Sequence, residues 1–251
     1  MNSIRNFRSL SGIKTPLGTL RENTLFRGGP LNNIQESDKQ LLLDKYNVKT
    51  IIDFRNSHEV NNEPNENIHS TIYKNVLIMQ EEGEVSADPK DIAKAKTETK
   101  DDSFMYDIYR DFVRTELAQQ GYKDFLLTIA NQNNGATYFH CTAGKDRTGF
   151  AATLILMILD ADMDTIMEEF LKTNTLILEH KDELLDSIVK FYPFDTTNEE
   201  LVMEVIGVKA EYLRASFDEI EKQYRTFDNY IKEALQLDKE TLDKIRKNLL
   251  K

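Results

Sequence analysis

One stretch near the middle of the chain decides the fold: His140-Cys141-Thr142-Ala143-Gly144-Lys145-Asp146-Arg147-Thr148-Gly149. It lies between a short apolar run, 136–139, and a longer one, 150–159, an order that predicts a strand, a tight loop and a helix. A loop at such a junction directs several backbone N–H groups toward the positive end of the helix that follows. We therefore expect an anion-binding site here.

The residues of this loop suit the hydrolysis of a phosphate monoester. Cys141 is the only cysteine of the chain, and a helix N-terminus with nearby amides and an arginine favours its nucleophilic thiolate form. Arg147 would hold two equatorial oxygens of the phosphate with its planar fork, which lysine could not do. The backbone N–H groups of residues 142 to 147 would supply the remaining donors, and Gly144 permits the tight backbone that turns them inward. The expected reaction passes through a phosphocysteine.

The loop resembles the signature of the protein tyrosine phosphatase superfamily: His, Cys, two variable residues, Gly, two variable residues, Arg, Ser or Thr, Gly. Every fixed position is met. The Lys145-Asp146-Arg147 within it is similar to the loop of the atypical bacterial tyrosine phosphatases, some of which also accept phosphoinositides. The resemblance covers nearly the whole chain, including Asn6-Phe7-Arg8 and Arg27-Gly28 near the start, and is weakest in residues 80–103.

Four other residues of the loop have expected functions in binding or catalysis. Thr148 would offer its hydroxyl to the Cys141 sulfur, and His140 would organise the loop by bonding to backbone. The resemblance implies that Asp146 is the general acid and later the base, with Asp107, Asp101 and Asp102 as alternatives. It also associates a lysine such as Lys145 with a second phosphate at the rim, whereas a solvated charge is the simpler interpretation. The phosphate-binding set is then Thr142, Ala143, Gly144, Lys145 and Thr148.

A second polar group follows the apolar run 48–54, which reads as a buried central strand. Asp53 and Arg55 lie at its carboxyl end, where open α/β sheets place their ligands. They either brace the phosphate loop from behind or form a local ion pair at a strand end, and the sequence does not separate the two. The resemblance places a Glu shortly after them, here Glu59. Arg8 and Arg27 are expected at the surface or in structural ion pairs.

The order of elements predicts an α/β fold: a central, mostly parallel sheet flanked by helices, with extra helices at the C-terminus. We expect one phosphatase domain, 1–251, in which 162–251 is helical. The polar segment 80–103 is expected to be an exposed insertion, either a solvated flexible segment or a mobile lid over the phosphate site.

The composition narrows the classes of partner. A net charge of −11 and a pI near 5.0 argue against binding to nucleic acid or to anionic membranes. No run reaches the length of a membrane span, and a single cysteine gives no sign of an oxidising compartment, so a cytoplasmic protein is expected, with export after signal removal left open. The four histidines show no paired spacing typical of a metal site, and no cofactor is expected.

The sequence thus predicts a metal-independent phosphatase acting on phosphotyrosine, with phosphoserine, phosphothreonine and phosphoinositides as further candidates and inorganic phosphate as product. A phosphoresidue-binding module without turnover is the main alternative. A sulfurtransferase has no need of the Thr148-Gly149 continuation, and an arsenate-reducing enzyme usually needs further cysteines, which this chain lacks.

Overall fold

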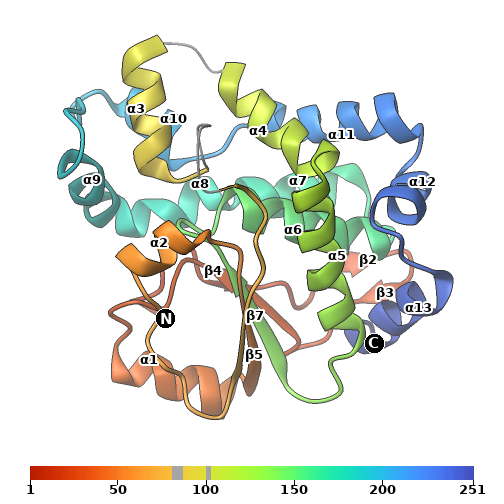
Figure 1. Cartoon of the computed structure of the whole chain (residues 1–251). Coiled ribbons are helices and arrows are strands. Elements are labelled where there is room, and N and C mark those ends of the chain that lie inside the picture. Colours follow the sequence, from red (N-terminus) through yellow and green to blue (C-terminus); the bar gives the residue numbers. More distant parts are fainter. Residues whose placement is uncertain (81–86, 100–102) are drawn as a thin grey trace.

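The computed structural model describes residues 1–80, 87–99 and 103–251, and it has a five-stranded sheet at its centre (Figure 1). The strands follow the order β1-β4-β7-β5-β6, in which β4, β7, β5 and β6 are parallel and β1 is antiparallel to β4. A separate two-stranded sheet joins β2 to β3. The strands span β1 Arg8–Ser9, β2 Lys14–Thr15, β3 Gly18–Thr19, β4 Leu25–Gly28, β5 Val48–Asp53, β6 Ile72–Asn75 and β7 Ala136–His140.

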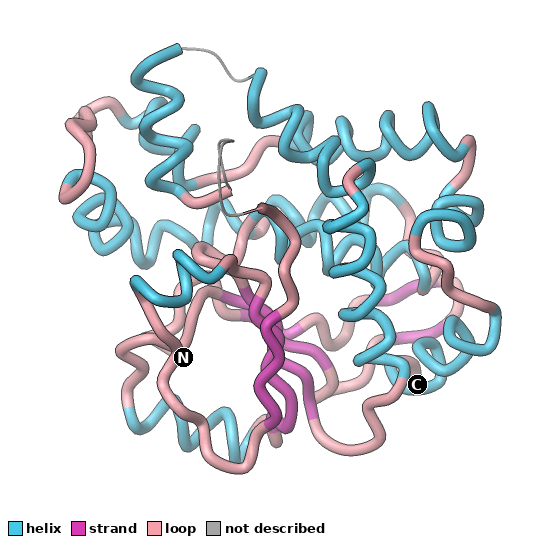
Figure 2. Tube along the Cα trace, viewed as in Figure 1, coloured by secondary structure: helices cyan, strands magenta, loops and turns pink. Residues whose placement is uncertain are grey.

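Helices cover both faces of the sheet, as Figure 2 shows around the central strands. In chain order they are α1 Glu36–Gln40, η1 Leu41–Lys45, α2 Ser57–Asn62, α3 Pro89–Thr99, α4 Ser103–Arg114, α5 Glu116–Ala130, α6 Asp146–Ile158, α7 Met163–Leu171, α8 Thr173–Leu176, η2 Ile177–His180, α9 Lys181–Val189, α10 Glu199–Ile206, α11 Ala210–Tyr224, α12 Phe227–Asn229, η3 Tyr230–Ala234 and α13 Lys239–Leu249. The α/β architecture with additional C-terminal helices confirms the predicted fold class.

Alternating residues of the buried strands build two separate cores. Ile52 of β5 and Phe139 of β7 belong to the larger core, which they share with α4, α5, α6 and the C-terminal helices. Their neighbours Ile51 and Tyr138 belong to a smaller core on the opposite face, under α1 and η1. Because successive side chains point to opposite faces, a strand with apolar residues on both must lie between two layers.

The parallel register gathers the polar strand ends at one edge. His140 at the end of β7 pairs with Asp53 of β5 on one side and Gly28 of β4 on the other. The chain then turns through 141–145 into α6. All residues of α6 except Met157 are buried, which explains why its sequence is apolar on nearly every side.

Residues 87–99 of the predicted insertion contain a helix, as a segment of part loop and part helix would, but several of them are buried rather than exposed. This part forms α3, which packs against α9 and α10 and buries Ile92, Ala93, Ala95 and Lys96. Residues 81–86 and 100–102 of the predicted insertion lie outside the described part of the chain. Within the described part, no helix is both long and apolar enough to cross a membrane.

Candidate active site

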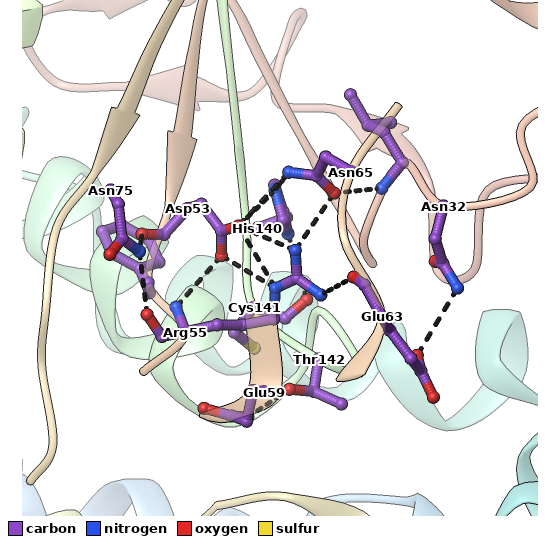
Figure 3. Close-up of polar contacts among 12 residues, drawn as sticks. Asn32, Asp53, Arg55, Glu59, Glu63, Asn65, Asn75, His140, Cys141 and Thr142 are labelled. Carbon is purple, nitrogen blue, oxygen red and sulfur yellow. Dashed lines mark hydrogen bonds and ion pairs between the residues drawn. The ribbon is translucent and has the colours of Figure 1, made fainter. Parts of the chain in front are cut away.

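The phosphate loop, residues 140 to 147, is enclosed within the protein. Strand β7 delivers His140 and Cys141 to the carboxyl edge of the sheet, and α6 begins at Asp146. Every residue from His140 to Gly149 is buried, and Cys141 retains 1% of its exposure. In Figure 3 the cysteine lies at the centre of a set of polar side chains from several segments. A charged ligand bound here would be largely removed from bulk water, which strengthens its electrostatic interactions.

Gly144 is required by both its backbone conformation and its surroundings. Its φ of +66° lies in the left-handed region, and a Cβ at this position would lie 2.2 Å from the carbonyl oxygen of Gly28. The Gly144 carbonyl accepts hydrogen bonds from Asn6 Nδ2 (2.8 Å) and Arg27 Nη2 (2.9 Å). The N-terminal segment and β4 therefore hold the carbonyl side of the phosphate loop.

Arg27 and Arg8 form an ion-pair network around Glu169 of α7. Arg27 Nη1 lies 2.7 Å from one carboxylate oxygen and Arg8 Nε lies 2.6 Å from the other. Burial and the neighbouring charge of Arg8 lower the pKa of Arg27 to about 10, so it remains charged at neutral pH. The prediction of structural ion pairs is confirmed for both arginines. A surface position is wrong for Arg27, which is fully buried.

Arg147 is oriented by Glu59 of α2. The guanidinium donates to both carboxylate oxygens, with Nη1–Oε2 at 2.7 Å and Nη2–Oε1 at 2.6 Å. Thr142 Oγ1 donates to the same carboxylate, and Glu59 closes the capping box of α2 with Asn56. Although burial opposes ionisation, the charge of Arg147 lowers the pKa of Glu59. Both charges are therefore present and fix the fork against the phosphate loop.

Several donors of the loop remain free for a ligand. Among the described residues, the amides of residues 142 to 145 donate to no other group, and the buried Nε of Arg147 has no partner. Buried donors without partners are costly, and one tetrahedral oxyanion could accept from several of them at once. The buried hydroxyl of Thr148 makes no hydrogen bond within the described chain, and its predicted role toward the Cys141 sulfur stays a prediction.

Asp53 and Arg55 form a buried pair that also reaches the phosphate loop (Figure 3). Arg55 Nη2 lies 2.8 Å from Asp53 Oδ2. That oxygen lies 3.6 Å from His140 Nε2, and Asn65 Nδ2 bridges the two, with 2.9 Å to the histidine and 3.2 Å to the aspartate. The local ion pair is therefore present, and it also lies next to His140; that it braces the phosphate loop stays a prediction.

The hydrogen bonds of His140 fix which of its ring nitrogens carries the proton. Because the amide nitrogen of Asn65 can only donate, Nε2 accepts and the ring proton lies on Nδ1, which is 3.2 Å from the Cys141 carbonyl. Burial lowers the pKa of His140 to about 4, so the ring is neutral at physiological pH. The ring thus contacts backbone, as expected, while its role in organising the loop stays a prediction.

Lys145 does not lie at the rim. Its ammonium group is buried and donates to the carbonyls of Val205 (2.8 Å) and Gly207 (2.9 Å) at the end of α10. The expected solvated charge is wrong, because the ammonium group is buried, whereas a contact with a second phosphate stays a prediction. The sequence could not reveal this contact because α10 lies some sixty positions further along the chain.

Asp146 is also enclosed. Its Oδ1 accepts a 2.8 Å hydrogen bond from the Tyr109 hydroxyl, and its Oδ2 lies 3.4 Å from Lys145 Nζ. Of the alternative acids, Asp107 is exposed and pairs with Arg110 at 3.1 Å, while Asp101 and Asp102 lie outside the described residues. Oδ2 has no hydrogen-bond partner within the described chain, and the role of Asp146 as general acid stays a prediction.

The comparison with known proteins agrees with this site. The sequence model of the tyrosine phosphatase family matches residues 1–251. The chain belongs to the tyrosine phosphatase family. A Cupriavidus necator protein, named provisionally as a tyrosine-protein phosphatase, is 30% identical over 242 residues, covering 94% of this chain and 84% of its own. The triple specificity protein phosphatase PtpB of Mycobacterium tuberculosis is 27% identical over 274 residues, covering 98% and 96%. A tyrosine-protein phosphatase of Nostoc commune is 54% identical over 39 residues, which are 16% of this chain and 13% of its own.

Sequence reasoning overlooked the partners that this family member uses to fix its phosphate loop. Glu59 was noted only by resemblance, and Asn6 and Glu169 received no role. The Asn-x-x-Glu pattern of Asn56 and Glu59 is a visible capping signal, but it does not say that the same carboxylate binds Arg147. Only the packing of α2 over the loop makes that contact.

Proposed function

We propose that this protein is a metal-independent cysteine phosphatase that hydrolyses phosphotyrosine through a phosphocysteine intermediate. The observation that carries the proposal is the set of free donors around Cys141: the amides of residues 142 to 145 and Nε of Arg147. Together they would accommodate the equatorial oxygens of a phosphoryl group while the sulfur attacks phosphorus. Membership of the tyrosine phosphatase family is a second, independent support for phosphatase activity.

The thiol and its surroundings provide the chemistry without a metal ion. Cys141 Sγ forms a bond to phosphorus as the bond to the leaving oxygen breaks, and water then displaces the thiolate and yields inorganic phosphate. Arg147, held by Glu59, stays in place as charge develops on the phosphoryl oxygens. Dividing a difficult hydrolysis into two steps lowers the barrier of each.

Phosphotyrosine is placed before phosphoinositides because of Lys145. In this arrangement its ammonium group bonds to the end of α10, so a second phosphate on the ligand would gain nothing from it. PtpB is named a triple specificity protein phosphatase, which supports testing more than one class of phosphorylated substrate in the assay. Phosphotyrosine is expected to be turned over fastest.

The test compares hydrolysis of a phosphotyrosine peptide, a phosphoserine peptide and phosphoinositide vesicles in the presence of chelator. Cys141→Ser should abolish turnover of each substrate and leave vanadate or phosphate binding detectable. Metal-dependent turnover, or a Cys141→Ser variant as active as the native protein, would refute the cysteine mechanism. Phosphate binding without turnover in the native protein would instead support the phosphoresidue-binding module.

A further inference from the structure

The side chain of Asn65 joins three segments of the chain behind the phosphate loop (Figure 3). Its Oδ1 accepts a hydrogen bond from the Leu31 amide at 2.7 Å and another from Arg55 Nη2 at 3.2 Å. A backbone amide and a guanidinium can only donate, so these two contacts identify the oxygen of the Asn65 amide. The nitrogen therefore faces the other way, toward the ends of β5 and β7.

The Nδ2 group of Asn65 lies between two acceptors. It donates to His140 Nε2 at 2.9 Å and to Asp53 Oδ2 at 3.2 Å, and these two atoms lie 3.6 Å apart. The carboxylate of Asp53 pairs with Arg55 at 2.8 Å, which keeps it ionised, and an ionised carboxylate can only accept. One NH₂ group with two hydrogens thus satisfies both acceptors. Without it, the two would face each other in a buried site.

This amide decides where His140 carries its own proton. Because Nε2 accepts from Asn65, the proton of the neutral ring lies on Nδ1, 3.2 Å from the Cys141 carbonyl. If the proton moved to Nε2, Asp53 would accept it, and Nδ1 would direct a lone pair at that carbonyl. Two acceptors at this distance repel each other, so the ring would no longer hold the carbonyl.

The direction of the Cys141 carbonyl matters for the phosphate loop. It shares a planar peptide unit with the Thr142 amide, and in a trans peptide the two groups point in opposite directions. The Thr142 amide is one of the donors that remain free for the phosphoryl oxygens. A ring that holds the carbonyl therefore also sets the direction of the first free amide after the nucleophile.

We infer that Asn65 is a positioning residue that keeps the His140 proton on Nδ1 and thereby fixes the peptide between Cys141 and Thr142. The inference rests on the proposed cysteine mechanism. Asn65 acts through the histidine, and the effect reaches the substrate as the direction of one amide. Binding of phosphate and turnover should therefore weaken together when the proton is moved.

The surroundings of His140 leave its ring neutral. The titratable groups around it come from β5, the turn after β5, β7 and α6: Asp53, Arg55, Tyr138, Cys141 and Arg147. Burial lowers the pKa of His140 to about 4; the charge of Asp53 and the bond to the Cys141 carbonyl oppose this shift, while Arg55 and Arg147 add to it. At neutral pH the ring has one proton and two nitrogens that can carry it, so a neighbouring group must select one.

Asn65→Asp reverses one donor and keeps the shape of the side chain. The oxygen that faces Leu31 and Arg55 is retained, whereas the nitrogen that faces His140 becomes an acceptor. Two carboxylates would then face Nε2, which should take up a proton and raise the pKa of His140 above about 4. ¹⁵N NMR of the ring should show the proton on Nδ1 alone in the native protein and a proton on Nε2 in the variant.

Turnover of Asn65→Asp should gain an additional pH dependence. At low pH the imidazolium carries a proton on both nitrogens and still donates from Nδ1. As the pH rises through the raised pKa of His140, the remaining proton stays on Nε2, and the bond to the Cys141 carbonyl is lost. Turnover and the affinity for inorganic phosphate should then fall together, by about 10²-fold.

Asn32→Asp is the matched control for the added charge. Asn32 Nδ2 lies 3.5 Å from Glu63 Oε2, so the substitution also places a second carboxylate beside an existing one near the loop (Figure 3). It should leave the proton of His140 on Nδ1 and the pH profile unchanged.

The spectrum separates this inference from the proposed function, since the position of the proton is read without turnover. A native ring with its proton on Nε2 would overturn the inference even if Asn65→Asp failed to fold, as would a proton that stays on Nδ1 alone in that variant. A moved proton with unchanged turnover and phosphate affinity would overturn the effect on the loop. Lack of turnover in the native protein would instead refute the proposed function, and phosphate affinity would still test the loop.

Discussion

Two sets of contacts of different character lie around the phosphate loop. The floor consists of the contacts of Asn6, Arg27 and Glu59 with the loop, and the roof consists of the contacts that Lys90, Lys96 and Lys145 make with α2 and α10. In the floor, Arg27 and Arg147 are 0% exposed and their partners Glu169 and Glu59 are each 4% exposed. In the roof, Glu63 and Glu204, the partners of Lys90 and Lys96, retain 25% and 24%.

This difference in exposure indicates that the two sets contribute differently to stability. Buried ion pairs lose much when one partner is removed, whereas partly exposed pairs contribute little to stability. The floor can therefore keep Arg147 and the loop amides oriented before substrate arrives. The two ion pairs of α3 in the roof can separate at a smaller cost, as the predicted lid over the phosphate site would require. The predictions below compare the two sets, from the largest effect to the smallest.

Removing the charge of Glu59 tests the floor most severely. Glu59→Gln leaves Arg147 without its counter-charge in a buried site, so the free energy of unfolding should fall by about 3–5 kcal/mol. The rate on 4-nitrophenyl phosphate should fall about 10²- to 10³-fold as the guanidinium loses its orientation. Urea unfolding and steady-state kinetics measure the two effects.

Glu66→Gln provides the control, since Glu66 makes a partly exposed pair with Lys39. The cost of Glu59→Gln should also depend on pH. The pKa of Glu59 is lowered on folding, so its contribution is present above the ordinary value of 4.5 and is lost as the pH falls through the lower folded value. A stability difference that persists in strong acid would argue against the ion pair as its source.

Gly144→Ala tests the fit of the floor to the loop backbone. Strain at the positive φ and the contact of Cβ with Gly28 should together reduce stability by about 2–4 kcal/mol, with a parallel loss of activity. Gly12→Ala is a matched control because Gly12 has a φ of +80° with nothing within 4 Å of the added Cβ. Equal effects of the two substitutions would show that the Gly28 contact is unimportant.

Lys145→Met tests the link between the loop and the roof. The carbonyls of Val205 and Gly207 would lose a buried donor, at a cost of about 1–3 kcal/mol. The ratio of phosphotyrosine to phosphoinositide turnover should stay the same. Lys172→Met, which changes an exposed lysine at the end of α7, is the control and should also leave this ratio unchanged. A selective loss of phosphoinositide turnover in Lys145→Met would place its ammonium group on the substrate.

Weakening the roof itself should have the smallest effect on stability. Lys96→Met removes a 2.9 Å pair with Glu204 and should cost about 0.2–1 kcal/mol. Limited proteolysis should nevertheless cut residues 80–103 faster in this variant than in Lys94→Met, and vanadate should slow the cutting in the native protein. Cutting that vanadate does not slow would contradict the lid.

The sequence by itself determined the strand, loop and helix around Cys141, because alternating and continuous apolar runs are local patterns. It also identified Arg147 and Gly144, whose types are required by the loop's own chemistry. A glycine inside a helix shows where packing enters: α5 runs through Gly121. A Cβ there would lie 2.5 Å from the Leu77 carbonyl, so this glycine serves close packing.

Only the tertiary structure decided which charges face one another. Glu59 meets Arg147 across 88 positions of sequence, Arg27 meets Glu169 across 142, and Lys145 meets Val205 across 60. Local periodicity carries no record of such pairs, since each depends on how α2, α7 and α10 pack around one loop.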